Sequence, residues 1–291
     1  MAKVLTVKQF FEIFPDDNAC LEHLMETRFG KTLDCPKCVK NGVFHKLAKM
    51  PAYTCSWCGH HIHPMKGTPF QATHTALQKW FYAIYLFTTT RHGVPAKELQ
   101  RQLGVTYKTA WRMGHEIRKY MAHIDGDAPL MGVVEADETL IGGVVKGGKP
   151  GMSIQGNKAM VFGMVERGGD VMLKIVPDSK KATLHPIINA NVEKSSAIFT
   201  DAFKSYRGLG WQGYNHQSVD HSAGEYVRGR VHTNSIENMW AMLKRSIRGT
   251  HIHVSPKHLD KYLGEFEFRF NLRKSPWLMF DRLLMGFGTS R

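Results

Sequence analysis

Three acidic residues stand where a metal-dependent enzyme would need them. Asp137 and Asp201 each close a strand-like apolar run, and Glu237 lies in a segment with helical periodicity. Carboxylate oxygens are the ligands that Mg²⁺ prefers. Two Mg²⁺ ions held by acids from two strand ends and a helix can activate water and then a 3′ hydroxyl, and can stabilise the leaving oxygen of an in-line phosphoryl displacement. The three acids therefore predict a site for phosphoryl transfer.

Lys244 adds a cation to this predicted site. It lies seven residues after Glu237 in the same helical segment. Because successive helical residues are about 100° apart, the two side chains share one face of the helix. A lysine in that position suits a nearby phosphate group.

The first two acids also have alternative interpretations. Asp137 could cap the turn before Gly142, in which case Glu135 or Glu138 would be the metal ligand. Asp201 could cap a helix that follows it. On these interpretations the acids would stabilise local structure and would hold no metal.

The third acid is the most open of the three assignments. Glu237 could belong to a capping box and reach back to Asn234 at the N-cap of its helix. Asn234 could also be the third metal ligand itself. The residues alone leave both possibilities open.

Four of the five cysteines form two C-x2-C pairs with 16 residues between them. The four are Cys35, Cys38, Cys55 and Cys58. Zinc takes four thiolates in a tetrahedron, and a C-x2-C turn offers two of them from one tight loop. Four cysteines leave no open coordination position, so the predicted zinc is structural. The alternatives are four unrelated buried cysteines or a nearby histidine in place of one thiolate, while Cys20 is expected in the core.

Residues 95–121 have the pattern of two helices joined by a short turn at Gly104. Inward-facing positions are predicted at Leu99, Leu103, Ala110, Met113 and Ile117. The positions expected to face DNA are Tyr107, Lys108, Arg112, His115 and Arg118. A second helix of this kind can enter a major groove, with its cations on phosphates. The alternative is an ordinary helical hairpin with a solvated basic face.

The charge of the chain points to a polyanionic partner. Its 39 Lys and Arg residues against 25 Asp and Glu residues give +14, which favours nucleic acid first and an anionic membrane surface second. An apolar fraction of 43% suits a packed core and excludes wholesale disorder. No run of 18 apolar residues and no signal peptide is evident. We therefore expect a cytoplasmic, nucleoid-associated protein with reduced thiols and no membrane partner.

The elements that must position these residues divide the chain into five segments. They are an N-terminal helical segment (1–30), a zinc ribbon (31–70), a helix-turn-helix region (75–123), a catalytic domain (130–275) and a C-terminal tail (276–291). Strands are predicted at 131–137, 159–165, 171–176 and 196–200, and helices near 183–192, 234–248 and 256–272. A linker is expected at 125–129, and glycines between 142 and 156 mark a flexible or hairpin segment. This order of strands and helices indicates a mixed α/β layer.

These motifs resemble the DDE transposases of bacterial and archaeal insertion sequences, in the ISXO-like group with an N-terminal zinc ribbon. The resemblance covers about residues 35–275. It rests on the C-x2-C pairs, Asp137-Glu-Thr with Ile-Gly-Gly following, Thr200-Asp201, and His232-Thr-Asn-Ser-Ile-Glu237 running into Trp240 and Leu243-Lys-Arg. The later segments 249–259, 262–265 and 269–273 also resemble the group. Each motif is weak alone, and together they are specific.

The resemblance implies an α/β protein of several domains, with an RNase H-like mixed-sheet catalytic domain after the zinc ribbon and helix-turn-helix. It also implies dependence on Mg²⁺, which Mn²⁺ can replace, recognition of terminal inverted repeats in double-stranded DNA, strand cleavage and strand transfer. The protein would act as a homo-oligomer on DNA. Carried over, Asp137, Asp201 and Glu237 become the catalytic triad, with Lys244 as its basic companion. Some members use Asn as the third ligand, so Asn234 stays open.

Two other functions fit the same residues. A nuclease with the same metal site would cleave DNA without joining it. A domesticated copy would bind DNA through the ribbon and the helix-turn-helix without catalysis. The presence of all three acids argues against such decay.

Overall fold

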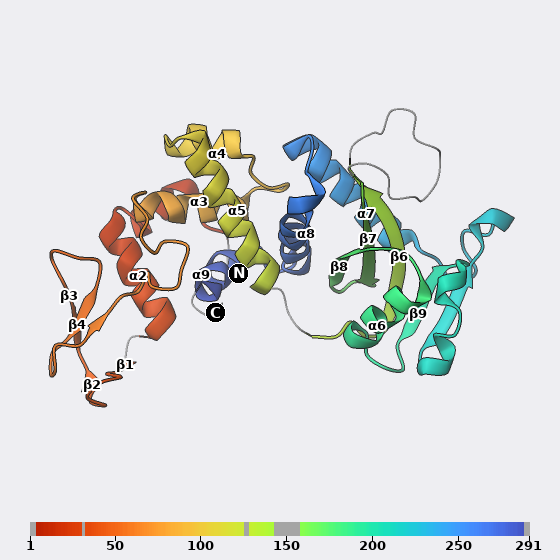
Figure 1. The fold of residues 1–291 in the computed structure, drawn as a ribbon, viewed down its shortest axis with the longest axis horizontal. Coiled ribbons are helices and arrows are strands. Elements are labelled where there is room, and N and C mark those ends of the chain that lie inside the picture. The colour runs from red at the N-terminus through yellow and green to blue at the C-terminus, as the bar shows by residue number, and fades with distance from the viewer. Residues whose placement is uncertain (1–3, 31–32, 125–127, 143–157, 288–291) are drawn as a thin grey trace. The chain divides into compact units, whose positions relative to one another are not determined.

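The computed structural model describes residues 4–30, 33–124, 128–142 and 158–287, which form two compact units (Figure 1). The first unit comprises Met1–Ile124 and Lys274–Arg291, and the second comprises Asp125–Arg273. The start of the predicted linker and the glycine-rich segment from residue 143 onward lie outside the described residues. Within the described ranges, no helix combines the length and the apolar character that a membrane crossing requires.

Two capped helices open the first unit. Thr6 forms a capping box on α1 (Val7–Ile13), and Asp16 accepts a backbone N–H in the first turn of α2 (Asp17–Phe29). The apolar helix α3 (Leu77–Thr89) supplies the largest share of the core of this unit. Its aromatic rings pack against those of α1.

Short strands between α2 and α3 form the predicted ribbon. They are β1 (Leu33–Asp34), β2 (Asn41–Gly42), β3 (Phe44–Lys46), β4 (Tyr53–Cys55) and β5 (His61–Ile62). β1 pairs with β2, and β3, β4 and β5 form a second antiparallel sheet. Sheets this small bury little apolar surface, so the ribbon needs a further source of stability.

The predicted pair of helices forms as α4 (Ala96–Leu103) and α5 (Tyr107–Ile124). Gly104 ends α4 in the left-handed conformation, with φ of 60°, which glycine adopts without steric cost. The hydroxyl of Thr106 accepts the N–H of Thr109 and caps α5. The five positions predicted to face inward are all buried.

The C-terminal segment corrects the sequence analysis, which predicted a tail at 276–291. A 3₁₀ turn (Pro276–Leu278) leads into α9 (Met279–Gly286), which packs in the first unit. Its apolar side chains recur at helical spacing and are buried, with Phe287 against the rings of Phe70 and Tyr120. The end of the chain therefore completes the core built by residues near its start.

A five-stranded mixed sheet forms the centre of the second unit. Its strands are β6 (Val133–Ile141), β7 (Ala159–Glu166), β8 (Val171–Val176), β9 (Ala197–Asp201) and β10 (Asn215–Val219), in the order β10-β9-β6-β7-β8. β6, β7 and β8 are antiparallel neighbours, whereas β9 runs parallel to both β6 and β10. Four strands were predicted; β10 was missed because its polar sequence, Asn-His-Gln-Ser-Val, has no apolar run.

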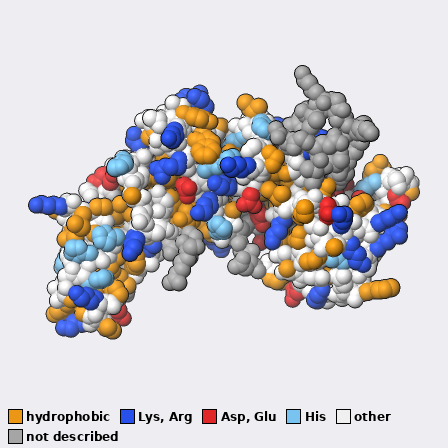
Figure 2. All heavy atoms as spheres, in the orientation of Figure 1, with side chains coloured by type: hydrophobic (Ala, Val, Ile, Leu, Met, Phe, Trp, Pro, Cys, Tyr) orange, Lys and Arg blue, Asp and Glu red, His pale blue; other side chains and the backbone are white. Residues whose placement is uncertain are grey.

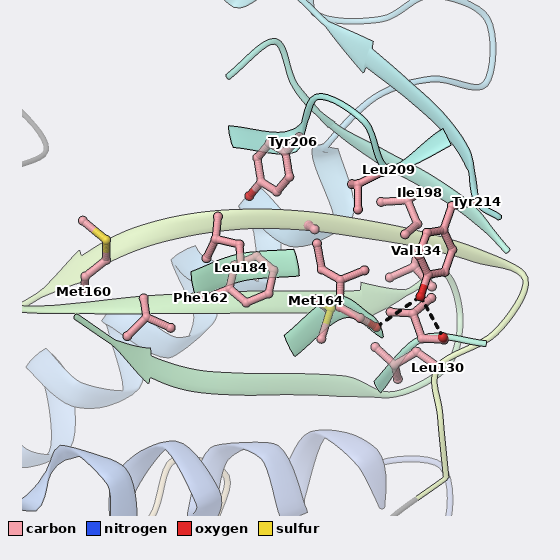
Figure 3. Close-up of a cluster of buried hydrophobic side chains, with 14 residues drawn as sticks. Leu130, Val134, Met160, Phe162, Met164, Leu184, Ile198, Tyr206, Leu209 and Tyr214 are labelled. Atoms are coloured by element: carbon pink, nitrogen blue, oxygen red, sulfur yellow. Dashed lines mark hydrogen bonds between the residues drawn. The ribbon is translucent and has the colours of Figure 1, made fainter. Parts of the chain in front are cut away.

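Helices cover both faces of this sheet. α6 (Lys181–Asn191) packs on one face, over the buried cluster that Figure 3 shows around Val134, Phe162 and Ile198. The opposite face is covered by α7 (Asn234–Ser246), which continues into a π-helical turn (Ile247–His251), and by α8 (Pro256–Asn271). Alternate residues of β6 and β7 therefore enter two separate cores. Three 3₁₀ turns, Lys204–Tyr206, Gly210–Gln212 and His221–Ala223, lie between β9 and α7.

Candidate active site

The register of β6 and β9 places the first two acids side by side. The two strands pair in parallel, and Glu135 and Phe199 are the last residues to pair. Each acid lies two residues beyond that last pair. Two residues along a strand return a side chain to the same face, so Asp137 and Asp201 lie on one face where the strands separate. This face is the one that α7 and α8 cover.

Asp137 does not end its strand, which corrects the sequence analysis. β6 continues to Ile141, and Asp137 pairs with Gly163 in the middle of the sheet. The acid is tolerated there because β9 has already ended its pairing with β6 and leaves that side of the strand open. On its other edge β6 stays paired with β7 at this position. The backbone of Asp137 is therefore fixed more firmly than it would be at the end of a strand.

Trp240 on α7 orients the carboxylate of Asp137. Its indole N–H donates to Oδ2 of Asp137 at 3.0 Å. The ring fits only because residue 163 is glycine, since a Cβ there would lie 2.6 Å from the ring. Burial raises the pKa of Asp137 to about 6, with smaller contributions from the charges of Asp201 and Glu237. The three acids are therefore near enough to interact electrostatically.

Asp201 ends β9 as the sequence predicts. Its Oδ1 accepts the N–H of Phe203 at 3.1 Å, and burial raises its pKa. The 3₁₀ turn that follows, Lys204–Tyr206, has no side-chain cap. The alternative in which Asp201 caps a following helix is therefore wrong, because the carboxylate closes a tight turn just before it.

Glu237 lies in the first turn of α7 with its side chain 54% exposed. Its Oε1 accepts the hydroxyl of Thr233 at 2.8 Å and lies 3.8 Å from Nε2 of His221. The N-cap of α7 is Thr233, and Asn234 is the first helical residue. The alternative of a capping box on Asn234 is therefore wrong, because that residue is not at the N-cap.

The side chain of Glu135 caps the N-terminus of α7. Its carboxylate is fully buried, and Oε2 accepts the N–H groups of Ser235 and Ile236 at 2.7 and 3.0 Å. An anion at a helix N-terminus also interacts favourably with the helix dipole. Because Glu135 lies two residues before Asp137 on the same sheet face, it joins the start of α7 to the strand that carries the first acid.

Arg167 neutralises the buried charge of Glu135. Its Nε donates to Oε1 of Glu135 at 2.6 Å, and its other nitrogens donate to the carbonyls of Arg230 and His232 at 2.8 and 3.0 Å. A buried ion pair is stable only when its remaining hydrogen-bonding groups are satisfied in this way. The sequence analysis missed Arg167, which lies in the turn between β7 and β8 with no motif around it.

Glu138 points to the opposite face of β6, toward the cluster under α6. It is buried beside Tyr206, and burial raises its pKa to about 8. Of the three acids on β6, Glu138 faces away from Asp201, and both oxygens of Glu135 accept hydrogen bonds from Arg167 and from the start of α7. Asp137 faces Asp201 and accepts the indole N–H of Trp240 on one oxygen. The geometry favours Asp137 over both alternatives as a ligand.

The four ribbon cysteines converge more closely than the acids. Among the described residues, they alone form a group of three or more potential ligands whose atoms lie within 4.8 Å of one another. Sγ atoms of Cys35 and Cys58 are 3.5 Å apart, and those of Cys38 and Cys55 are 3.8 Å apart. A tetrahedral zinc with Zn–S bonds of about 2.3 Å requires about 3.8 Å. The four thiols therefore fit zinc, while Cys20 is a core residue as predicted.

Two models of known protein families match the chain over the regions that contain the acids and the cysteines. The model of an ISXO2-like transposase domain matches residues 129–271, and that of a transposase zinc-ribbon domain matches residues 15–61. A transposase-like protein of Haemophilus influenzae is 34% identical over 97 residues, which are 33% of this chain and 77% of that protein.

The chain belongs to the ISXO2-like transposases.

Two further similarities span more of the chain. A protein in the transposable element ISH50 of Halobacterium salinarum is 26% identical over 90% of this chain and 94% of its own length. The structure of a pre-cleavage Mos1 transpososome covers 69% of this chain and 76% of its own at 14% identity, with a TM-score of 0.29. At that score the structural likeness carries no argument, and the family assignment rests on sequence.

The α5 helix of this transposase presents a basic and aromatic surface near its start. Tyr107, Lys108, Trp111 and Arg112 are all exposed there. The sequence analysis missed Trp111, which it placed in no role. Across the face seen in Figure 2, Lys and Arg side chains recur over both units, while Asp and Glu form a few small groups.

Two residues expected to face DNA lie inside the first unit instead. Arg118 is 2% exposed, donates to the carbonyl of Val94 at 2.9 Å and lies over the ring of Phe87. His115 is buried as well. The expectation for both is wrong because their positions on α5 face the interior of the unit, whereas Lys119 and His123 further along the helix are exposed.

Proposed function

We propose that this transposase binds the terminal inverted repeats of its own insertion sequence and catalyses Mg²⁺-dependent strand cleavage and strand transfer. The observation that carries the proposal is the convergence of three elements on one sheet face. β6 brings Asp137, β9 brings Asp201, and α7 brings Glu237. The strand order supports an RNase H-like domain, in which three antiparallel strands are followed by two parallel ones.

In this proposal Asp137, Asp201 and Glu237 hold the metal, and their oxygen donors suit Mg²⁺ or Mn²⁺. Bound Mg²⁺ would supply activation of the attacking oxygen and stabilisation of the leaving oxygen. Trp240 fixes one carboxylate oxygen of Asp137 by its indole N–H. We take Glu237 rather than Asn234 as the third ligand, because its contacts with Thr233 and His221 hold a carboxylate beside the start of α7.

Lys244 is proposed to contact the DNA phosphate next to the cut. Partial burial lowers the pKa of Lys244. The negative charge of Asp137 is near enough to raise that pKa and so opposes the effect of burial. An ammonium group beside the acids would offset the repulsion between them and the phosphate that they must approach. The lysine thereby adds substrate binding to a cluster that is otherwise anionic.

The helix pair α4 and α5 is proposed to act as a helix-turn-helix on the terminal repeats. Tyr107, Lys108 and Arg112 at the exposed start of α5 are suited to the major groove and its phosphates. Replacing Lys108 or Arg112 by Ala should each reduce the salt slope of binding by about one. Catalysis on paired ends would involve a homo-oligomer assembled on DNA.

One experiment separates this function from its alternatives. A duplex that ends in the terminal repeat flanking the gene is incubated with protein and Mg²⁺, first intact and then pre-cut at the 3′ end with target DNA present. Cleavage of the first and joining of the second are expected. Cleavage without joining would indicate a nuclease, and binding without either reaction would indicate a domesticated DNA-binding protein.

A further inference from the structure

A pocket of about 360 Å³ lies beyond the acids, between the end of β6 and the end of α7. Most of its lining residues are apolar, and three cationic or ionisable side chains, Lys244, Arg248 and His253, stand among them. No acidic residue is among the described residues that line it. An apolar interior with cations around it suits a ligand that has a flat apolar part and an anionic part.

The pocket is connected to the candidate active site. Lys244 lines it and is also close enough to both Asp137 and Arg248 to respond to their charges. On the other wall, Ile141 lies four residues after Asp137 in the same strand. At about 3.3 Å per residue that is about 13 Å, the rise of about four base pairs along DNA.

Ile252 stands at the mouth of this pocket in a strained conformation. Its φ of 62° and ψ of −55° belong to a γ-turn, closed by the N–H of His253 on the carbonyl of His251 at 2.6 Å. Positive φ is unfavourable for a β-branched residue, and glycine would adopt it more easily. The side chain is nevertheless 85% exposed, so burial in the protein does not explain why an isoleucine stands there.

The turn follows directly from the helix that carries the third acid. α7 runs without interruption into the π-helical turn Ile247–His251, which delivers Ile252 to its tip. π-helical turns are frequent at functional sites, and strained residues cluster at ligand-binding positions. The tip is therefore held by the same element that positions Glu237 and Lys244.

We propose that this pocket is a subsite for one unstacked base of the DNA close to the scissile phosphate, with Ile252 as the wedge that separates it from its neighbour. This inference rests on the proposed function. Apolar side chains inserted between base steps unstack them, and enzymes that extrude a base receive it in a fitted pocket. Arg248 and His253 hold the phosphates of the displaced nucleotide, while the apolar walls receive the base.

The test uses 2-aminopurine, whose fluorescence rises when it leaves the stack. Terminal-repeat duplexes carry it singly at each of the four positions on either side of the cut. The wild-type protein should raise the fluorescence at one or two neighbouring positions, and Ile252→Ala should abolish that rise. The Asp137→Asn protein, which cannot cleave, should retain it and so excludes strand breakage as its cause.

Three variants and a modified DNA make the test specific. Ile252→Ala should slow cleavage about tenfold to a hundredfold, as expected for a lost unstacking contribution. Ile175→Ala removes the same side chain from an exposed position on β8 and should cleave normally. Ile252→Gly relieves the backbone and should melt no earlier than the wild type while cleaving as slowly as Ile252→Ala. An abasic residue at the responsive position should restore both slow variants to near the wild-type rate.

The outcomes separate the subsite from the proposed function. A wild type that cleaves without any rise in fluorescence would overturn the subsite alone, as would an Ile252→Ala variant with an unchanged signal and rate. If Ile252→Ala cleaves slowly and abasic DNA does not restore its rate, the subsite is also overturned. Ile252 would then be assigned to a contact with another protein molecule. A wild type that fails to cleave at all would count against the proposed function.

Discussion

The zinc ribbon and the proposed carboxylate site of this transposase are built in opposite ways. The ribbon takes its four cysteines from two tight turns within 24 residues, and their sulfur atoms already lie at spacings that suit zinc. The acids come from two strands and a helix spread over 101 residues, and their oxygen atoms stay further apart. Residues of two short loops can coordinate a structural metal. A catalytic metal needs open coordination positions, and its ligands need further residues that hold them in place.

The supports of the carboxylate site are themselves long-range contacts. Glu135 caps α7 from a position 100 residues earlier in the chain, and Trp240 reaches back 103 residues to Asp137. In the described part of the ribbon, backbone hydrogen bonds within each knuckle shape the turns that carry the thiols. Loss of zinc should therefore unfold the ribbon, while loss of an acid should stop chemistry and leave the fold intact.

The largest effect is expected from removing zinc. Metal analysis should find about one zinc per chain, and Cys35→Ser should lose it together with the ordered ribbon, since structural zinc supplies on the order of 10 kcal/mol to such folds. Cys20→Ala, which removes a cysteine from the core, should keep its zinc. A zinc-free native protein in which all four ribbon thiols react freely would contradict the ribbon site.

The next largest effect is expected from the acids. Asp137→Ala, Asp201→Ala and Glu237→Ala should each reduce Mg²⁺-dependent cleavage by orders of magnitude without weakening DNA binding. Thermal stability without metal should not fall, because each change relieves repulsion between acids. Asn234→Ala is the matched control and should cleave within a few-fold of the wild type. An active Glu237→Ala beside an inactive Asn234→Ala would move the third ligand to Asn234.

A smaller effect is expected from the support of α7. Glu135→Gln should lower the maximal cleavage rate about tenfold to a hundredfold and raise the Mg²⁺ concentration needed for half-maximal rate, as loss of an outer support does in metal sites. It should also cost about 3 kcal/mol of stability, because Arg167 loses its partner.

Glu265→Gln provides the control for that stability loss. It breaks a buried ion pair with Arg269 on α8, away from the acids. It should destabilise the protein without changing the Mg²⁺ requirement. Equal shifts in the Mg²⁺ requirement for Glu135→Gln and Glu265→Gln would reduce Glu135 to a merely structural residue.

The smallest effect is expected from Trp240→Phe. Phenylalanine keeps most of the ring against Gly163 but loses the N–H that orients Asp137. One lost hydrogen bond to a charged group corresponds to about 1.5–3 kcal/mol at most, and we expect a three- to tenfold slower cleavage. Trp277→Phe in the first unit should leave the rate unchanged. An unaltered rate for Trp240→Phe would show that the backbone alone positions the acid.

The parts of this molecule that the sequence predicts well are those with local signals. The C-x2-C spacing identified the ribbon, the buried positions of α4 and α5 followed from helical periodicity, and four strands of the sheet followed from apolar runs. In each case a few neighbouring residues determine the outcome. The same holds for Asp201 at the end of β9, which follows from the apolar run before it.

The features that the sequence analysis failed to predict have a common physical cause. β10 pairs with β9 through its backbone and carries a single apolar residue, Val219, which is too little for an apolar run. The residues of α9 are buried by their packing in the first unit. Arg118 has the sequence signature of an exposed cation, yet the carbonyl of Val94 and the ring of Phe87 satisfy it inside the unit. Glu135 and Arg167 find each other across 32 residues. Such contacts depend on tertiary packing, which no short segment encodes.

The central claim is that Asp137, Asp201 and Glu237 hold metal at one point, and iron-directed cleavage of the protein tests it without any knowledge of the DNA. Fe²⁺ in place of Mg²⁺, with ascorbate and peroxide, generates radicals that cut the backbone close to the bound ion. We predict three groups of fragments, ending near residues 137, 201 and 237, which excess Mg²⁺ suppresses and Asp137→Asn abolishes. Fragments at only one of these positions, or a pattern that neither Mg²⁺ nor the substitution changes, would contradict the account.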